Sequence, residues 1–328
     1  YDTPFFLFSE RQLLENYEKI RTSFSKYYKN IRIDYSVKTN NEIAVLKILN
    51  TVGSSVEVVS AYEIEMCLKA GFKPEKIVFD GPCKSNDEIE FAIKCGIHAI
   101  YADSERELER ISIIANKMHK IVNVGLRINL GLKSVLDGPA ETYIGKFGVE
   151  TRKVVSVLYK ASMMKNLQVI AISTHIGSQI LDIKHYIKSV EILTKLAGEL
   201  KMIGVNIQEI NLGGGYPSKS LIKNTLPTLA LSFLNISFEQ KVPQIEKYGN
   251  AISMAFKKGV IRNKLGKIIL CCQPGRSISS SMGLMITKAR VVKDKWIFLD
   301  ASTSSLPESI FFAKRKVVKI VNTVGDDE

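Results

Sequence analysis

Eight short apolar segments alternate with segments of helical periodicity along most of this chain, and this alternation sets narrow limits on its fold. The segments with strand character are residues 32–38, 56–60, 76–80, 98–102, 122–129, 168–175, 208–212 and 267–273. Strands that alternate with helices form parallel sheets, because each helix carries the chain back across the sheet. Eight such units in 328 residues predict an α/β fold: a closed (β/α)8 barrel of the TIM type with room for a small second domain.

The segments between these strands carry helical signals. Apolar residues recur at helical spacing over 61–71, and Gly71 is suited to the end of a helix. A capping box of Ser104 and Glu107 is expected to begin a helix over 104–118, and the longest expected helix covers 186–203. An open doubly wound sheet is the rival fold, but it would need a glycine-rich turn after the first strand. No such turn follows residue 38, so the barrel is favoured.

The pattern changes after residue 281, where the helical segments cease. Residues 283–292, 296–300 and 316–321 read as extended segments, and residues 5–8 are extended as well. We expect the early segment to pair with the late ones. The sequence thus predicts a barrel domain over 12–282 and a partial β-sandwich or β-barrel domain made by 1–11 and 283–328.

Composition and charge argue against several classes of function. The net charge of +13 comes from 46 basic and 33 acidic residues, but the basic residues are dispersed and no aromatic residues alternate with them. A lysine-rich surface explains this charge better than a nucleic-acid site does. No apolar segment reaches membrane-spanning length, and the first residues do not resemble a signal peptide. The five cysteines lack CxxC spacing, so we expect no disulfide, no metal site and a cytoplasmic location.

Four groups of reactive or phosphate-binding residues coincide with the ends of expected strands. They are Lys38 after the first strand, His175 with Gly177 and Ser178 after the sixth, Gly213, Gly214 and Gly215 after the seventh, and Gln273, Gly275 and Arg276 after the eighth. In (β/α)8 barrels the carboxyl ends of the strands carry the active site. We therefore expect these groups to meet at one end of the barrel.

Each group has an ordinary interpretation when it is taken alone: a surface lysine, a core histidine, a flexible glycine turn, an arginine in a surface ion pair. Together they form a set suited to pyridoxal 5′-phosphate. A desolvated Lys38 with a lowered pKa would be a good nucleophile for a Schiff base. The His175 ring could stack on the cofactor, while glycine N–H groups and Arg276 could bind its phosphate.

The order of these motifs resembles that of the fold-type III pyridoxal phosphate-dependent decarboxylases, which include the diaminopimelate, ornithine and arginine decarboxylases. It is most similar to the pattern of the diaminopimelate decarboxylases. The matching segments are 35–40, 57–60, 79–85, 175–179, 211–215 and 274–277, together with Glu63 and Arg127. The likeness extends from about residue 3 to about residue 320.

The resemblance implies decarboxylation of an amino acid or diamino acid, of the kind used in lysine biosynthesis, by a homodimer whose active sites are completed across its interface. Lys38 and His175 would be the catalytic residues. The cofactor would be held by these two and by Ser178, Gly213, Gly214, Gly215, Gln273, Gly275 and Arg276. Glu57, Glu63, Asp80 and Arg127 would have supporting roles.

Three departures from the family pattern leave other functions open. Gln273 stands where the family has a glutamate that keeps the pyridine nitrogen protonated, and residues 307–311 lack the arginine and tyrosine that grip the far end of diaminopimelate. The family's Cys-Glu-Ser-type loop and late tyrosine do not occur in this chain, so we expect the β domain to be partial. The alternatives are a non-catalytic, regulatory relative and a pyridoxal phosphate enzyme with another substrate or reaction.

Overall fold

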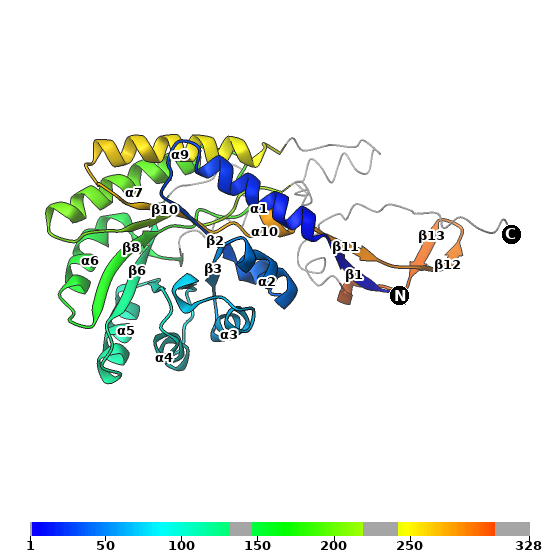
Figure 1. Cartoon of the computed structure of the whole chain (residues 1–328), viewed down its shortest axis with the longest axis horizontal. Helices are drawn as coiled ribbons and strands as arrows, with labels where there is room; N and C mark the ends of the chain where they lie inside the picture. Colours follow the sequence, from blue (N-terminus) through cyan, green and yellow to red (C-terminus); the bar gives the residue numbers. More distant parts are fainter. Residues whose placement is uncertain (1, 132–145, 219–241, 306–328) are drawn as a thin grey trace. The chain divides into compact units, whose positions relative to one another are not determined.

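The computed structural model describes residues 2–131, 146–218 and 242–305. Contacts within the chain divide it into two compact units, one of residues 10–217 and 243–279 and the other of residues 1–9, 218–242 and 280–328. The first unit holds the barrel, and the described part of the second holds short antiparallel strands (Figure 1). These bounds lie close to the expected residues 11 and 282, and the assignment of the units as separate domains stays a proposal.

Eight parallel strands close the barrel, as the sequence predicts. They are β2 (Ile31–Ser36), β3 (Ser55–Val58), β4 (Ile77–Asp80), β5 (Ala99–Ala102), β6 (Val122–Asn129), β8 (Leu167–Ser173), β9 (Glu209–Asn211) and β10 (Ile269–Cys272). Each strand pairs in parallel with the next, and β10 pairs with β2 to complete the ring. The two-residue strand β7 (Val149–Glu150) pairs with the end of β6. The (β/α)8 prediction is therefore confirmed, and the expected strands differ from the observed ones only at their ends.

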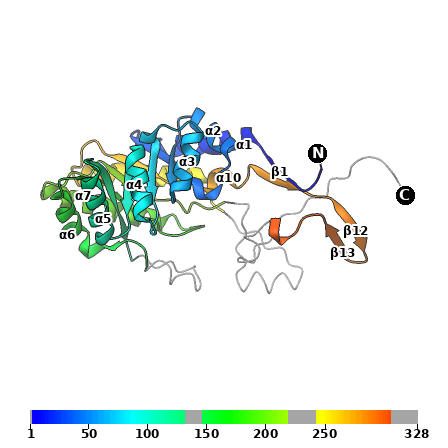
Figure 2. The ribbon, with the colours of Figure 1, turned by 90° about the horizontal axis from the view of Figure 1, so that it is seen from below.

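Helices form the outer layer of this unit. They are α1 (Glu10–Phe24), α2 (Ile43–Thr51), α3 (Ala61–Lys69), α4 (Asn86–Cys95), α5 (Glu105–Lys117), α6 (Val154–Ser162), α7 (Lys184–Met202), α9 (Ile245–Arg262) and the short α10 (Arg276–Ser279). Helices α2 to α7 lie outside the strands in both views of the ribbon (Figures 1 and 2). The strands are buried on both faces for this reason, which explains why most of them are rich in apolar residues.

The helix starts follow the sequence signals with one correction. The Ser104 hydroxyl accepts the N–H of Glu107, as expected of a cap, but the Glu107 carboxylate accepts the N–H of Asp103 at 2.7 Å and not that of Ser104. A complete capping box occurs instead at the start of α4, where Ser85 and Glu88 bond to each other's N–H groups. Gly71 follows α3 with a φ of +90°, a conformation that glycine adopts without strain.

A buried ionic group fills the amino end of the barrel. Arg32 on β2 lies 2.7 Å from Asp34 and 2.6 Å from Glu209, the first residue of β9. His98, which precedes β5, lies 2.7 Å from the same Glu209 oxygen. These charges compensate one another, as buried ionic groups must. They occupy the end of the barrel opposite to the carboxyl ends of the strands.

The strands in the described part of the second unit form two antiparallel pairs, and a 3-10 turn follows at Thr303–Ser305. Strand β1 (Phe5–Phe8) pairs with β11 (Gly283–Ile286), so the expected union of the first strand with late ones is confirmed. Strands β12 (Ala289–Lys293) and β13 (Trp296–Leu299) form a hairpin. Residues 287 and 288 separate β11 from β12, where the sequence suggested one segment, and both contact the Asp300 carboxylate. The expected strand at 316–321 lies outside the described residues, and no described helix is long and apolar enough to cross a membrane.

Candidate active site

Lys38 lies at the carboxyl end of β2, in the short 3-10 turn Val37–Thr39 and not within the strand. Its Nζ donates to both carboxylate oxygens of Glu57, at 3.0 and 3.2 Å. Glu57 is on the neighbouring strand β3 and is only 1% exposed. The Ser36 hydroxyl donates to the same carboxylate, so Glu57 is held from two sides. The lysine amine is thereby fixed at the mouth of the barrel.

The charge state of Lys38 differs from the expected one. Burial disfavours the ammonium, but the nearby carboxylates, chiefly that of Glu57 and then those of Asp80 and Glu63, together hold the pKa of Lys38 above its usual value. The expected lowering of this pKa is therefore wrong for the chain in this state: burial acts in the expected direction, but the side chain stays 49% exposed and the carboxylates reverse the net shift. Burial raises the pKa of Glu57. Lys38 must therefore lose a proton before it can act as a nucleophile.

His175 follows β8 and carries an uncharged ring. Its Nδ1 accepts the N–H of Gly214 at 3.3 Å, which leaves the proton on Nε2. Burial, followed by the positive charges of Lys38 and Arg127, lowers the pKa of His175 to about 3. The ring is neutral at physiological pH and is suited to stacking on a flat ligand.

Gly213, Gly214 and Gly215 interlock the ends of three strands. Gly213 and Gly215 adopt φ values of +68° and +87°, which favour glycine. A Cβ on Gly214 would overlap the carbonyl of Gln273, and a Cβ on Gly215 would overlap that of Gly177. The N–H of Gly213 donates to Asn211 Oδ1 at 2.8 Å, and that of Gly214 donates to His175. Two of the three N–H groups expected at a phosphate are therefore bonded within the protein.

Gln273 reaches across the barrel mouth to Asp80. Its Nε2 donates to Asp80 Oδ2 at 3.0 Å, and the glutamine is 4% exposed. Gly275 packs directly against Thr39, next to Lys38, and Arg276 begins α10. The charge of Arg276 also contributes to the lowered pKa of His175, after burial and the other charges. The turn after β10 therefore belongs to the same site as Lys38 and His175.

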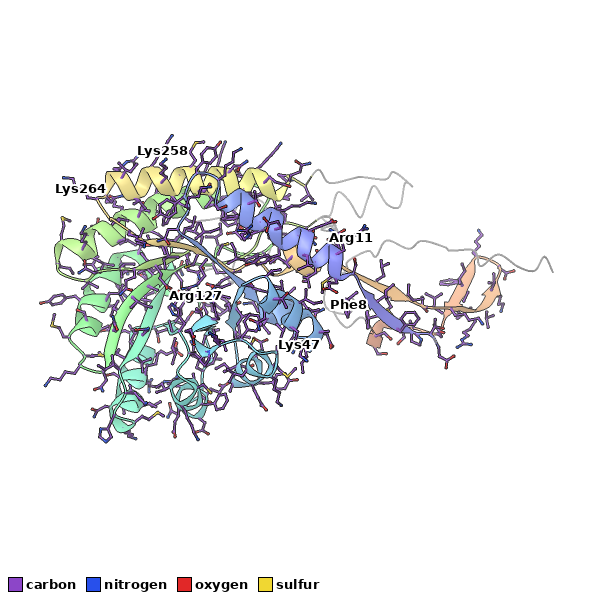
Figure 3. All side chains as sticks on the ribbon, in the orientation of Figure 1. Phe8, Arg11, Lys47, Arg127, Lys258 and Lys264 are labelled. Atoms are coloured by element: carbon purple, nitrogen blue, oxygen red, sulfur yellow. The ribbon has the colours of Figure 1, made fainter. Side chains whose placement is uncertain are left out.

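The remaining expected residues lie around this centre. Glu63 accepts the N–H of Val59 at 2.8 Å and so stabilises the turn between β3 and α3. Arg127, labelled in Figure 3, projects from β6; its Nη1 lies 3.7 Å from Asp103 and its guanidinium lies over the ring of Phe147. Ser178 is exposed in the loop that carries His175.

Sequence reasoning assigned no role to two residues that build the site, although both lie in segments that match the family pattern. Ser36 orients Glu57, and Asn211 orients both Gly213 and Thr174. Ser36 lies within the matching segment 35–40 and Asn211 begins the segment 211–215, so the match itself was the available signal. It also missed Lys84, whose buried Nζ donates to the carbonyls of Gly81 and Tyr101 and lies 3.4 Å from Glu107.

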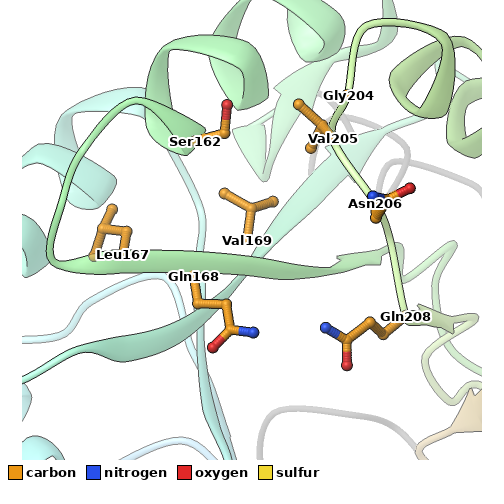
Figure 4. Close-up of a pocket in the computed structure, with 8 residues that line it drawn as sticks. All are labelled: Ser162, Leu167, Gln168, Val169, Gly204, Val205, Asn206 and Gln208. Atoms are coloured by element: carbon orange, nitrogen blue, oxygen red, sulfur yellow. The ribbon is translucent and has the colours of Figure 1, made fainter.

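A cavity of about 270 Å³ lies elsewhere, beside the amino ends of β8 and β9 (Figure 4). Its lining residues are Ser162, Leu167, Gln168, Val169, Gly204, Val205, Asn206 and Gln208. None of them is titratable, and they lie at the other end of these strands from the residues above. This cavity is separate from the candidate active site.

Known proteins are similar to this chain in both sequence and fold. The family described as "pyridoxal-dependent decarboxylase, pyridoxal binding domain" matches residues 11–280. Diaminopimelate decarboxylases of Methanothermobacter thermautotrophicus and Aquifex aeolicus are each 30% identical to it, over 93% and 98% of this chain and 68% and 71% of their own lengths. A crystal structure of a Helicobacter pylori diaminopimelate decarboxylase variant complexed with L-lysine superposes with a TM-score of 0.81 at 25% identity, over 97% of this chain and 75% of that one. The chain therefore belongs to the pyridoxal-dependent decarboxylases.

Proposed function

We propose that this chain removes the carboxylate of a diamino acid, as a pyridoxal 5′-phosphate-dependent enzyme of the diaminopimelate decarboxylase kind. The observation that carries this proposal is the Lys38 amine, which Glu57 holds beside strand ends that bear His175 and Arg276. The residues fit the cofactor: an amine, an uncharged flat ring and a cation lie within electrostatic range of one another, and glycines allow the backbone to approach closely.

When bound, pyridoxal phosphate supplies an aldehyde that takes up amines and a ring that withdraws electrons from the bond to the leaving carboxylate. We assign Lys38 to the aldehyde. Its ammonium must give up a proton, and the Glu57 carboxylate 3.0 Å away is the acceptor within reach. His175 offers its ring face without adding a positive charge.

The phosphate is assigned to groups on the loops after β8, β9 and β10. Arg276 supplies the charge-assisted contact, and Ser178 and Gly215 lie on loops that can contribute donors. Gly213, Gly214 and Gly275 act chiefly by letting these loops pack closely. Gln273 is assigned to the cofactor ring, with Glu57, Glu63, Asp80 and Arg127 in support.

A diamino acid is the proposed substrate class, which would place the chain in lysine biosynthesis. The relatives above are named for diaminopimelate, and the superposed crystal structure holds L-lysine. Residues 307–311, where the chain departs from the family's substrate grip, lie outside the described residues. Release of carbon dioxide from diaminopimelate, lysine, ornithine and arginine, compared side by side, identifies the substrate.

A non-catalytic relative is the second candidate. It is favoured by the neutral Gln273 and by the internal hydrogen bonds of the Gly213 and Gly214 N–H groups. The experiment that separates the two is incubation with pyridoxal phosphate followed by borohydride reduction. A visible absorption band and an adduct on Lys38 support the proposal of a decarboxylase. A chain that takes up no cofactor would refute that proposal. Cofactor uptake without carbon dioxide release from any of these amino acids would favour an altered reaction.

We further propose a homodimer located in the cytoplasm, in line with the expectations from the sequence. Light scattering of the purified chain tests the first proposal. A protein that is monomeric at all concentrations would contradict it.

A further inference from the structure

The hydrogen bond between Gln273 and Asp80 joins the ends of two strands that are not neighbours in the sheet. Gln273 follows β10 and Asp80 ends β4, and the strand order β4-β3-β2-β10 places two strands between them. The 3.0 Å contact between Nε2 and Oδ2 therefore crosses the mouth of the barrel. The intervening strands β2 and β3 carry Lys38 and Glu57 at or near this same end.

The backbone of Gln273 is fixed on both sides. Its N–H donates to the carbonyl of Gly213 at 2.8 Å, and its own carbonyl lies so close to Gly214 that a Cβ there would overlap it. The residue is only 4% exposed. Its amide is thus a buried polar group with a defined place, and such groups require defined partners.

The chemistry of Asp80 determines which end of the amide faces it. An ionised carboxylate only accepts hydrogen bonds, so it selects the NH2 group of Gln273 and turns the carbonyl Oε1 away. An amide that donates to a charged acceptor is polarised, and its carbonyl becomes a better acceptor. The pair consequently offers a partially negative oxygen that suits an N–H donor and disfavours an unprotonated ring nitrogen.

The electrostatic surroundings of Asp80 agree with a place at the centre of the site. Its charge acts on Lys38, Glu57, His175, Lys84 and Asp103. Lys84 also ties the loop after Asp80 to β5, through the carbonyls of Gly81 and Tyr101. Asp80 is therefore held at a site that already contains the cation of Lys38 and the neutral ring of His175.

We propose that Asp80 is a positioning residue, and that the Asp80–Gln273 pair does the work of a single carboxylate toward the cofactor. Asp80 fixes the amide and supplies the negative charge, and Gln273 Oε1 accepts the hydrogen bond of a protonated ring nitrogen. This inference rests on the proposed function, because it assigns the pair to bound pyridoxal phosphate. A purely structural pair would tie β4 to β10 and leave the ring nitrogen unaffected.

The test follows the ring nitrogen itself. The full chain is loaded with pyridoxal phosphate labelled with 15N at that nitrogen, and the 15N chemical shift is followed against pH for the wild type and Asp80→Asn. We expect Asp80→Asn to lower the pH of half-protonation by about one unit or more, the usual effect of a nearby charge. Asp87→Asn removes an exposed carboxylate from the first turn of α4 and serves as the control, with no expected shift.

The double variant Asp80→Asn/Gln273→Glu exchanges the carboxylate and the amide. The introduced amide can donate to the introduced carboxylate, so the wild-type protonation of the ring nitrogen should return. Gln273→Glu alone places two carboxylates in contact, and we expect a lower melting temperature of the cofactor-free chain than in the double variant.

The outcomes separate this inference from the proposed function. Equal half-protonation in wild type and Asp80→Asn, with cofactor bound in both, would overturn the role of Asp80 and leave the proposed function standing. The same would follow if the wild-type ring nitrogen stayed unprotonated over the whole pH range in which the chain is folded. A wild-type chain that takes up no pyridoxal phosphate would overturn both.

Discussion

Lys38 and Glu57 form an ion pair between neighbouring strand ends, with Nζ at 3.0 and 3.2 Å from the two carboxylate oxygens. Glu57 is buried, whereas the lysine is half-exposed. Because the pKa of Lys38 is raised, the amine holds its proton at the position where it has to react. The strength of the ion pair therefore sets the pH at which Lys38 becomes a free amine.

Replacing Glu57 by glutamine should shift cofactor attachment to lower pH. Burial lowers the pKa of Lys38, and the carboxylates of Glu57, Asp80 and Glu63 raise it. Glu57 makes the largest of these raising contributions, so removing its charge lowers the pKa and leaves more free amine at a given pH. The absorption band of attached cofactor, titrated against pH, should move down by about one unit. Glu42→Gln, at an exposed position before α2, should leave the titration unchanged. A shift to higher pH in Glu57→Gln would contradict this account of the pair.

Lys38→Ala should abolish covalent attachment of the cofactor and leave the barrel folded. The side chain is 49% exposed and belongs to the mouth of the barrel and not to its packed interior. Borohydride reduction followed by peptide mass spectrometry locates the adduct. Lys47→Ala, at an exposed position of α2 marked in Figure 3, is the matched control and should retain it. An adduct on another lysine of the wild type would remove Lys38 from its assigned role.

Arg276→Ala should weaken cofactor binding. Loss of a charge-assisted hydrogen bond to phosphate costs about 1.5–3 kcal/mol, which corresponds to roughly tenfold to a hundredfold in dissociation constant. Fluorescence titration with pyridoxal phosphate measures the change. Arg262→Ala, at the exposed end of α9, should bind as the wild type does. Equal affinity in both variants would show that Arg276 has only a structural role.

Glu209→Gln should destabilise the chain at neutral pH and much less in acid. Burial raises the pKa of Glu209, but His98 and Arg32 outweigh burial and lower it to about 2. A depressed carboxylate pKa stabilises the fold above the unfolded value, about 4.3, and that contribution fades as the pH falls toward 2. Removing the charge from this buried group should cost about 3 kcal/mol at neutral pH.

Urea unfolding of the cofactor-free chain measures this difference. The difference in the free energy of unfolding between wild type and Glu209→Gln should become smaller as the pH falls below the pKa of glutamate in the unfolded chain. Glu75→Gln, at an exposed position, serves as the reference variant at neutral and at acid pH. A gap that is independent of pH would mean that packing, and not charge, explains the loss.

The sequence predicted the barrel because its signal is local and repeated. Most strands of the barrel are short, buried and rich in apolar residues, and they are followed by residues that begin a helix or turn, as Ser85 and Glu88 do before α4. The same logic placed Lys38, His175 and Gln273 at one end, since parallel strands bring their carboxyl ends together. These features need no knowledge of distant contacts.

The pKa values and hydrogen bonds of the site residues could not be predicted, because they depend on contacts between residues that are distant in the sequence. The raised pKa of Lys38 depends on a partner on β3, and the lowered pKa of His175 depends first on burial and then on charges from several strands. The hydrogen bond between Gln273 and Asp80 joins residues 193 positions apart, so no local sequence pattern predicts it. Sequence reasoning identified Gln273 as a departure from the family and Asp80 as a supporting residue, but the hydrogen bond between them needed the structure.

The pairing of β1 with β11 has a consequence for how the protein is made. Phe5 lies opposite Ile286, so β1 has no partner until nearly all of the described chain has been synthesised. During that interval its row of phenylalanines is unpaired, and apolar edges of this kind invite association with other chains. The barrel strands, in contrast, pair mostly with their sequence neighbours and can form as they are synthesised. In the cell, the pairing of β1 with β11 should therefore need the help of a chaperone more than the folding of the barrel does.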